Sequence, residues 1–272
     1  MARTYIAAFL LLITLTGAFF AHRYTRSLSS SLAEEVPLWA EEARSGALDP
    51  ERVWRAPLLN DSRVFRCSEE ENQPSFTVDL LLDASASRLH CQEVIAAQGT
   101  ILAQSLAACG IPVRVSSFCS LRGYTVLRVL KGFADKSLQG IDQYFASGWN
   151  RDGLALRAAG DLVSFDPGPA PRHLLILLTD ASPNDSRRVP PSPEQPLGCD
   201  YGGSYGVDDA AAEVRTLRRK GLRVSAVFMG EDSSSHDAER IYGKNLARIR
   251  GMDQLARAAG RLIQNEIREL GD

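Results

Sequence analysis

The sequence lacks an excess of basic residues, internal repeats and long low-complexity tracts. Its 31 Lys and Arg residues are balanced by 33 Asp and Glu residues, which leaves a formal net charge of −2. Because no strong basic field exists to attract phosphates, this balance argues against a nucleic-acid-binding protein. The 272 residues, 44% of them hydrophobic, are enough for one large domain with a complete core and an additional segment.

Closely spaced cysteines are also missing. The number of cysteines is odd, and no two have the C-x-x-C spacing of a zinc site or a redox motif. The cysteines are Cys67, Cys91, Cys109, Cys119 and Cys199. This usage is typical of a reducing compartment rather than of a disulfide-bonded scaffold. We expect Cys91, Cys109 and Cys119 to be buried as small apolar side chains.

Signatures of catalysis are missing as well: there is no G-x-x-x-x-G-K-[ST] loop, no H-E-x-x-H and no G-x-G-x-x-G after a strand. The stretch GGSYG, residues 202–206, formally matches the G-x-S-x-G motif of serine hydrolases, which requires an apolar strand directly before it. The preceding PSPEQPLGCDY cannot be a central strand. A metal-dependent phosphoesterase would need a base and a phosphate clamp that the sequence does not offer. We therefore expect a non-catalytic protein.

A hydrophobic segment stands near the beginning of the chain. Residues 5–21, YIAAFLLLITLTGAFFA, carry no charge and are flanked by Arg3, Arg23 and Arg26. As a helix this segment would be about 26 Å long, slightly short of a hydrocarbon core of about 30 Å. We predict that residues 1–26 form a single-pass membrane anchor, with a cleaved signal peptide as the alternative; the flanking arginines do not decide its orientation. Residues 27–72 then form a polar, partly helical connector.

From Phe76 onward, segments with strand and helix patterns alternate along the chain. The expected strands are 76–83, 111–119, 124–133, 172–180, 222–230 and a short edge strand at 246–250. The expected helices are 89–110, 137–147, 152–164, 207–221 and 252–270. Such alternation is typical of a doubly wound α/β fold, in which helices flank a mostly parallel sheet. We predict one such domain over residues 73–272, with ligands bound at the carboxyl ends of the strands.

The stretch DLLLDASAS, residues 79–87, ends an apolar strand in oxygen-bearing side chains. Asp83 is followed at alternate positions by Ser85 and Ser87. In a locally extended segment, alternate positions point to the same side. The stretch is therefore either a polar turn or a set of oxygen ligands for one ion.

A second apolar strand, RHLLILLTD, also ends in an aspartate, Asp180. Between the two strands the stretch NRDG, with Asn150 and Asp152, opens a helix. All of these side chains offer hard oxygen atoms, which select Mg²⁺, Mn²⁺ or Ca²⁺ over zinc. Because the donors include few carboxylates, the ion would be under-neutralised, and a carboxylate of a partner protein would suit it.

The sequence resembles a von Willebrand factor A (vWA) domain with a metal-ion-dependent adhesion site, from about Phe76 to Leu270. The matching stretches are DLLLDASAS, GWNRDGLALRAAG, LLILLTDASPND and YGGSYGVDDAAAEVRTLRRKG. Among proteins with this domain, it resembles the bacterial nitric-oxide-reductase activation proteins and the large subunit of cobaltochelatase. The resemblance implies that Asp83, Ser85 and Ser87 are first-loop ligands. It also implies that Asp180 belongs to the third loop.

The sequence departs from the family pattern in two loops. The family usually has threonine in the second loop, where this sequence offers Asn150 or Asp152, and either can serve. The third loop reads Thr-Asp-Ala where many members have glycine after the aspartate. This substitution leaves the geometry of that turn open at the level of the sequence.

The resemblance implies a metal-dependent protein-binding module that works with a MoxR-type AAA+ ATPase to activate or assemble a client metalloenzyme. A Glu or Asp of the partner protein would complete the coordination of Mg²⁺, with Mn²⁺ or Ca²⁺ as the alternatives. An alternative function is that of a subunit of an ATP-driven metal chelatase in tetrapyrrole or cobalamin synthesis. A third possibility is a membrane-anchored adhesion domain. The ATPase partner and the unpaired cysteines favour a domain that faces the cytoplasm.

The loop from Ser182 to Tyr205 is much longer than an ordinary connection between a strand and a helix. Such loops are usually either functional or disordered. The residues expected to border the cation site and bind a partner are Asp185, Tyr201, Tyr205 and Asp208. The alternative is that its proline-rich part is a loose insertion.

Overall fold

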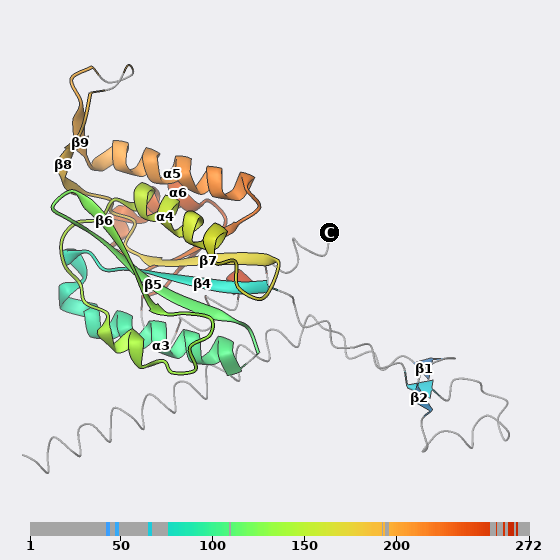
Figure 1. Cartoon of the computed structure of the whole chain (residues 1–272). Helices are drawn as coiled ribbons and strands as arrows, with labels where there is room; N and C mark the ends of the chain where they lie inside the picture. Colours follow the sequence, from blue (N-terminus) through green and yellow to red (C-terminus); the bar gives the residue numbers. More distant parts are fainter. Residues whose placement is uncertain are drawn as a thin grey trace, which may run out of the picture.

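A six-stranded sheet with helices on both faces forms the centre of the molecule (Figure 1). The structure is a computed structural model, and it describes residues 42–43, 47–48, 65–66, 76–108, 110–191, 193, 196–250, 254, 258, 261–263 and 265. The strands are β4 (Phe76–Asp83), β5 (Val113–Leu121), β6 (Tyr124–Lys131), β7 (Arg172–Thr179), β10 (Arg223–Phe228) and β11 (Leu246–Arg248).

The order of the strands across the sheet is β11-β10-β7-β4-β5-β6. Neighbouring strands are parallel except for β5 and β6, which are antiparallel. The prediction of a mostly parallel sheet flanked by helices is therefore confirmed. In this order β4 and β7 lie side by side at the centre, so their carboxyl ends meet at one edge of the sheet.

Helices cover the two faces of the sheet unequally. Helix α3 (Gln92–Ala108), preceded by the 3₁₀ turn η1 (Ala86–Cys91), lies on one face, whereas α4 (Asp152–Phe165), α5 (Gly203–Arg219) and α6 (Ser235–Tyr242) lie on the other (Figure 1). Leu80 and Leu82 of β4 belong to the first hydrophobic core, and Leu81 belongs to the second. A strand that is buried on both faces is apolar at successive positions, which explains the continuous apolar runs in the sequence.

The predicted helix at 137–147 is wrong. This segment contains only the short 3₁₀ turn η2 (Gln139–Gln143). The backbone of Gly140 lies so close to the carbonyl oxygen of Leu130 that a Cβ atom would overlap it. The segment therefore packs against the end of β6 instead of continuing as a helix.

The long loop before α5 has a structure of its own. It contains an antiparallel hairpin of β8 (Asp185–Val189) and β9 (Cys199–Tyr201). Helix α6 was also not predicted, because its sequence SHDAERIY is short and mostly polar. Cys91 and Cys119, which we expected to be buried, are only half-buried and pack against the first core, and Cys109 lies outside the described residues.

The N-terminal predictions fall almost entirely outside the described residues. The expected anchor at 1–26 lies outside the described residues. The described part of the connector consists of three two-residue strands, β1 (Glu42–Ala43), β2 (Ala47–Leu48) and β3 (Phe65–Arg66). These strands pair in the order β1-β3-β2. Within the described ranges, every helix is too short or too polar to cross a membrane. Most of the expected helix at 252–270 also lies outside these ranges, although Ala258, Leu262 and Ile263 pack in the first core.

Candidate metal centre

The first polar stretch lies where β4 leaves the sheet. Asp83 is fully buried, and its Oδ1 atom accepts a hydrogen bond of 2.9 Å from the backbone N–H of Ser85. The hydroxyl oxygens of Ser85 and Ser87 lie 2.9 Å apart. The hydroxyl of Tyr144 donates to the backbone carbonyl of Asp83 and so fixes the end of the strand. The loop thus brings one carboxylate and two hydroxyl groups together, although Ser87 lies in the 3₁₀ turn η1 and not in the extended segment that the sequence predicted.

The third loop begins with Asp180, directly after β7. Its Oδ2 atom accepts a hydrogen bond of 3.1 Å from the hydroxyl of Ser87, and its Oδ1 atom accepts one of 3.2 Å from the backbone N–H of Ser182. Ala181 has a φ of 52°, in the left-handed region that glycine adopts most readily. The turn after Asp180 therefore has a glycine-like conformation although the residue is alanine, which costs about 1–2 kcal/mol.

The second loop holds both candidates of the sequence, in different roles. The side-chain amide of Asn150 donates to Oδ1 of Asp152 and to the carbonyl of Ser182, each over 3.1 Å. Its Oδ1 atom accepts a hydrogen bond of 3.2 Å from the backbone N–H of Asn184. Asn150 therefore ties the second loop to the third. Asp152, in contrast, is fully buried and has an Oδ2 atom without a hydrogen-bond partner.

Burial and neighbouring negative charge disfavour the charged forms of Asp83 and Asp152. Burial, followed by the negative charge of Asp180, raises the pKa of Asp83 to about 7. Burial, followed by the charges of Asp83 and Asp180, raises the pKa of Asp152 well above its ordinary value. The Oδ2 atoms of Asp83 and Asp152 are both buried without a hydrogen-bond partner. Unpartnered carboxylate oxygens at this edge are the donors that a hard divalent cation takes, so the residues fit such an ion.

Arg88 supplies positive charge next to this centre. Its guanidinium forms an ion pair with Oδ2 of Asp180, and both side chains are almost completely buried. It also donates to the backbone carbonyl of Met229 over 3.4 Å. Because Arg88 and a cation would share the carboxylate of Asp180, the arginine partly compensates the negative charge of the centre.

A depression of about 360 Å³ opens over these loops. It is lined by Ser85, Ala86, Ser87, Gly148, Trp149, Asn150, Asp180, Ser182 and Asn184. Within the ranges that the structure covers, no three His, Cys, Asp or Glu side chains are grouped closely enough to hold a metal by themselves. A cation at this place would therefore need the serine oxygens in addition to the carboxylates.

The four residues expected to bind a partner lie in different environments. Asp185 is buried and forms an ion pair of 2.5 Å with Arg151. Tyr201 is buried, and the guanidinium carbon of Arg151 lies over its ring, 4.7 Å from the ring centre. Tyr205 is half-buried and meets the Tyr201 ring edge to face. Asp208 is exposed on α5. Asp185 and Tyr201 therefore both contact Arg151 in a buried setting, and the binding of a partner by these four residues stays a prediction.

Sequence reasoning missed Arg88, Tyr144 and Asp209. The hydroxyl of Tyr201 donates to Asp209 over 2.8 Å and accepts a hydrogen bond from the backbone N–H of Gly153. A Cβ atom at Gly153 would overlap the Asp209 carboxylate, so the glycine of NRDG permits this close approach. That glycine, and the arginine directly after DASAS, were the signals available in the sequence.

Comparison with known proteins shows limited similarity in sequence. No family model matches the chain. Protein NorD of Brucella suis is 27% identical over 141 residues, which correspond to 50% of this chain and 20% of NorD. The chain thus spans about a fifth of the length of this relative.

Two solved structures are similar in fold. The vWF domain of the pilus tip protein Mfa5 from Porphyromonas gingivalis has a TM-score of 0.50 at 12% identity, over 71% of this chain and 95% of that domain. The manganese-loaded TRAP protein of Plasmodium vivax has a TM-score of 0.50 at 16% identity, over 70% of this chain and 74% of TRAP. At these identities the similarity shows a shared fold.

Proposed function

We propose that this protein, whose central domain has the von Willebrand factor A fold, is a metal-dependent protein-binding module that takes part in activating a nitric oxide reductase. The fold rests on the mostly parallel sheet and on the solved structures that share it. The link to nitric oxide reductase rests on the similarity to Protein NorD over half of the chain. Because this chain matches only a fifth of Protein NorD, the role of NorD is applied to this chain only as a proposal.

The observation that supports metal binding is the pair of unpartnered carboxylate oxygens on Asp83 and Asp152. Together with Ser85, Ser87 and Asp180 they would hold one divalent cation, directly or through water, and Mg²⁺ suits this oxygen set. Asn150 would hold the second loop in place. When bound, the cation would supply a coordination position for a carboxylate of a partner protein.

Residues around the candidate metal centre would arrange this coordination position for the partner. Asp83 and Asp152 present buried carboxyl groups that a cation would keep ionised, and Ser87, an exposed residue, lines the depression. Trp149, whose side chain is 44% exposed, lines the same depression and offers an apolar contact to an incoming partner. No catalytic role is assigned to any of these residues.

The proposed partners are a MoxR-type AAA+ ATPase and a client metalloenzyme, which the ATPase would remodel while the vWA domain holds it. We further propose that residues 1–26 anchor the chain in a membrane and that the vWA domain faces the cytoplasm. The chelatase-subunit alternative stays an untested prediction.

The first test is titration calorimetry of the full chain with Mg²⁺ and Mn²⁺, in nanodiscs of zwitterionic lipid. The Asp83→Asn variant removes one charge at constant size, and Asp161→Asn changes an exposed aspartate of α4 as a control. We expect the wild type and the control to bind one ion and Asp83→Asn to bind at least about tenfold more weakly. No binding by the folded wild type would contradict the metal-dependent mechanism.

The second test addresses the link to nitric oxide reductase. Cells that lack the protein would be complemented with the wild type, Asp83→Asn or Asp161→Asn, and nitric oxide consumption by their membranes would be measured. We expect the wild type and the control to restore consumption, and Asp83→Asn to leave the reductase present but inactive. Full consumption in cells without the protein would refute the proposed role.

A further inference from the structure

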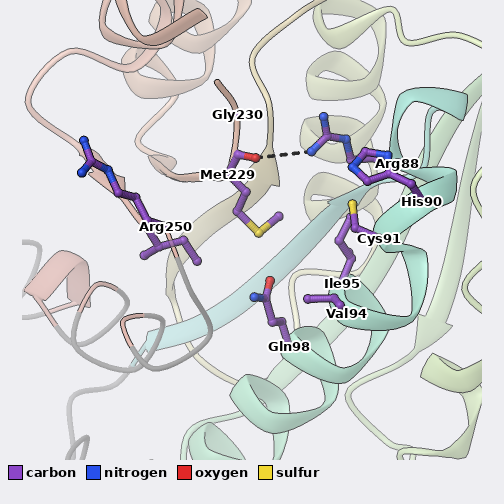
Figure 2. A pocket seen from close by; sticks show the side chains of 10 residues that line it. Arg88, His90, Cys91, Val94, Ile95, Gln98, Met229, Gly230 and Arg250 are labelled. Atoms are coloured by element: carbon purple, nitrogen blue, oxygen red, sulfur yellow. Dashed lines mark hydrogen bonds between the residues drawn. The ribbon is translucent and has the colours of Figure 1, made fainter. Parts of the chain in front are cut away.

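A second pocket lies beside the metal centre, between the start of α3 and the loops that follow β10 and β11 (Figure 2). Its volume is about 420 Å³, within the range of small-molecule sites. It is lined by Arg88, His90, Cys91, Val94, Ile95, Gln98, Met229, Gly230, Ile249 and Arg250. None of the residues proposed to hold the cation is among them.

One wall of the pocket is apolar. It consists of Val94 and Ile95 from α3, Met229 after β10 and Ile249 after β11. Ile95 and Ile249 are buried members of the first core, whereas Val94 is 42% exposed. This wall suits an aliphatic chain, because burying such a chain removes apolar surface from water.

The charged residues of the pocket are all basic. No aspartate or glutamate occurs among the described residues that line it. The Arg88 guanidinium is already paired with Asp180 and donates to the carbonyl of Met229 (Figure 2). Arg250 is exposed at the rim and forms no ion pair with a described acidic residue. The mouth of the pocket therefore favours an anion over a cation.

Gln98 provides a polar group that the fold itself does not use. Its side chain is 3% exposed, and its Oε1 atom has no hydrogen-bond partner. Figure 2 shows it on α3, among the side chains that line the pocket. A buried acceptor without a partner is costly, so a ligand that donates to it would gain a hydrogen bond that no described protein group makes.

We propose that this pocket binds a small organic carboxylate with an aliphatic body and a hydrogen-bond donor at its far end. Arg250, exposed at the rim, takes the carboxylate at the mouth. The aliphatic body lies on Val94, Ile95, Met229 and Ile249, and the donor reaches Oε1 of Gln98. An ω-hydroxy fatty acid of medium length has all three features.

Three matched probes test the proposal on the full chain in nanodiscs of zwitterionic lipid, with EDTA present and empty nanodiscs as the blank. 8-Hydroxyoctanoate carries both end groups, octanoate lacks the donor, and 1,8-octanediol lacks the charge. We expect 8-hydroxyoctanoate to bind about fivefold to tenfold more tightly than either of the others. Equal affinity of the three probes, or no binding above the blank, would overturn the proposal. Because EDTA removes divalent cations, neither result bears on the metal centre.

Variants separate the two ends of the pocket. Gln98→Met is expected to abolish the advantage of 8-hydroxyoctanoate over octanoate and to keep its advantage over the diol. It should leave the unfolding temperature unchanged or raised, because it removes a buried acceptor without a partner. Arg250→Gln, on the surface, is expected to abolish the advantage of 8-hydroxyoctanoate over the diol and to keep its advantage over octanoate. Arg215→Gln, exposed on α5 across the sheet, serves as the control and should bind like the wild type. If 8-hydroxyoctanoate kept its advantage over both other probes in Gln98→Met and in Arg250→Gln, the assignment of its hydroxyl to Gln98 and of its carboxylate to Arg250 would be refuted.

Discussion

Asp83, Asp152 and Asp180 approach one another at the edge of the sheet, where the charge of Asp180 disfavours the charged forms of both Asp83 and Asp152. Asp180 has the guanidinium of Arg88 beside it, whereas Asp83 and Asp152 each keep one buried oxygen without a partner. Burial and the charge of Asp180 raise the pKa of Asp83 to about 7. The protonation of Asp83 therefore changes near neutral pH, although an ordinary aspartate is ionised from about pH 4 upward.

This shift predicts how stability depends on pH without a divalent cation. Between about pH 4 and pH 7 the unfolded state binds fewer protons than the folded state, so the free energy of unfolding falls as pH rises, by up to about 1.4 kcal/mol per pH unit. Asp152 acts in the same direction. Mg²⁺ binds the ionised form and should remove most of this fall. Thermal unfolding from pH 5 to pH 8, in EDTA or Mg²⁺, measures both effects.

The Asp83→Asn variant is the control for the pH experiment. Since it cannot ionise at position 83, its stability in EDTA should fall less between pH 5 and pH 8 than that of the wild type, and Mg²⁺ should change it little. His173, whose burial lowers its pKa, contributes with the opposite sign in both proteins and cancels in the comparison. Parallel curves for the two proteins would contradict the assignment of the shift to Asp83.

At the scale of elements, the second loop depends on how closely α4 approaches α5. Gly153 near the start of α4 lies against Asp209 of α5, and Tyr201 of β9 bonds to both. The sequence pattern predicted both helices, because their apolar positions recur at helical spacing. It did not predict the hairpin of β8 and β9, since proline and glycine in a long loop also indicate a loose insertion.

Gly153→Ala is expected to destabilise the protein by about 1–3 kcal/mol, because its Cβ atom would displace the Asp209 carboxylate in a buried contact. In an exposed helix the same change would stabilise by up to about 1 kcal/mol. The two effects differ in sign, so urea unfolding decides between them. In the Asp209→Ala background, where the obstacle is gone, Gly153→Ala should no longer destabilise. Equal destabilisation in both backgrounds would show that Asp209 is not the obstacle.

At the scale of the whole molecule, Arg88 connects the two proposed sites. It pairs with Asp180 at the metal centre and lines the second pocket. An anion in the pocket would attract Arg88 and release Asp180 for a cation, and a cation at Asp180 would in turn favour the anion. Such coupling is reciprocal by thermodynamic necessity.

We therefore expect saturating 8-hydroxyoctanoate to tighten the binding of Mg²⁺ to the full chain by about fivefold, within the usual range of coupling between sites. Titration calorimetry with and without the probe measures the change. Arg250→Gln, which weakens the probe and leaves the metal ligands intact, should lose the effect at the same probe concentration. Unchanged or weaker Mg²⁺ binding would show that Arg88 does not link the sites.

The sequence by itself determined the α/β class and the position of Asp83, Ser85, Ser87 and Asp180, because periodicity encodes burial and the strand ends follow from it. Only the tertiary structure distinguished Asn150, which ties two loops together, from Asp152, which keeps an unpartnered oxygen. It likewise decided the partner of Arg88 and the pocket around Gln98. These features join segments that are far apart in the chain, and such contacts depend on packing, which no local pattern records.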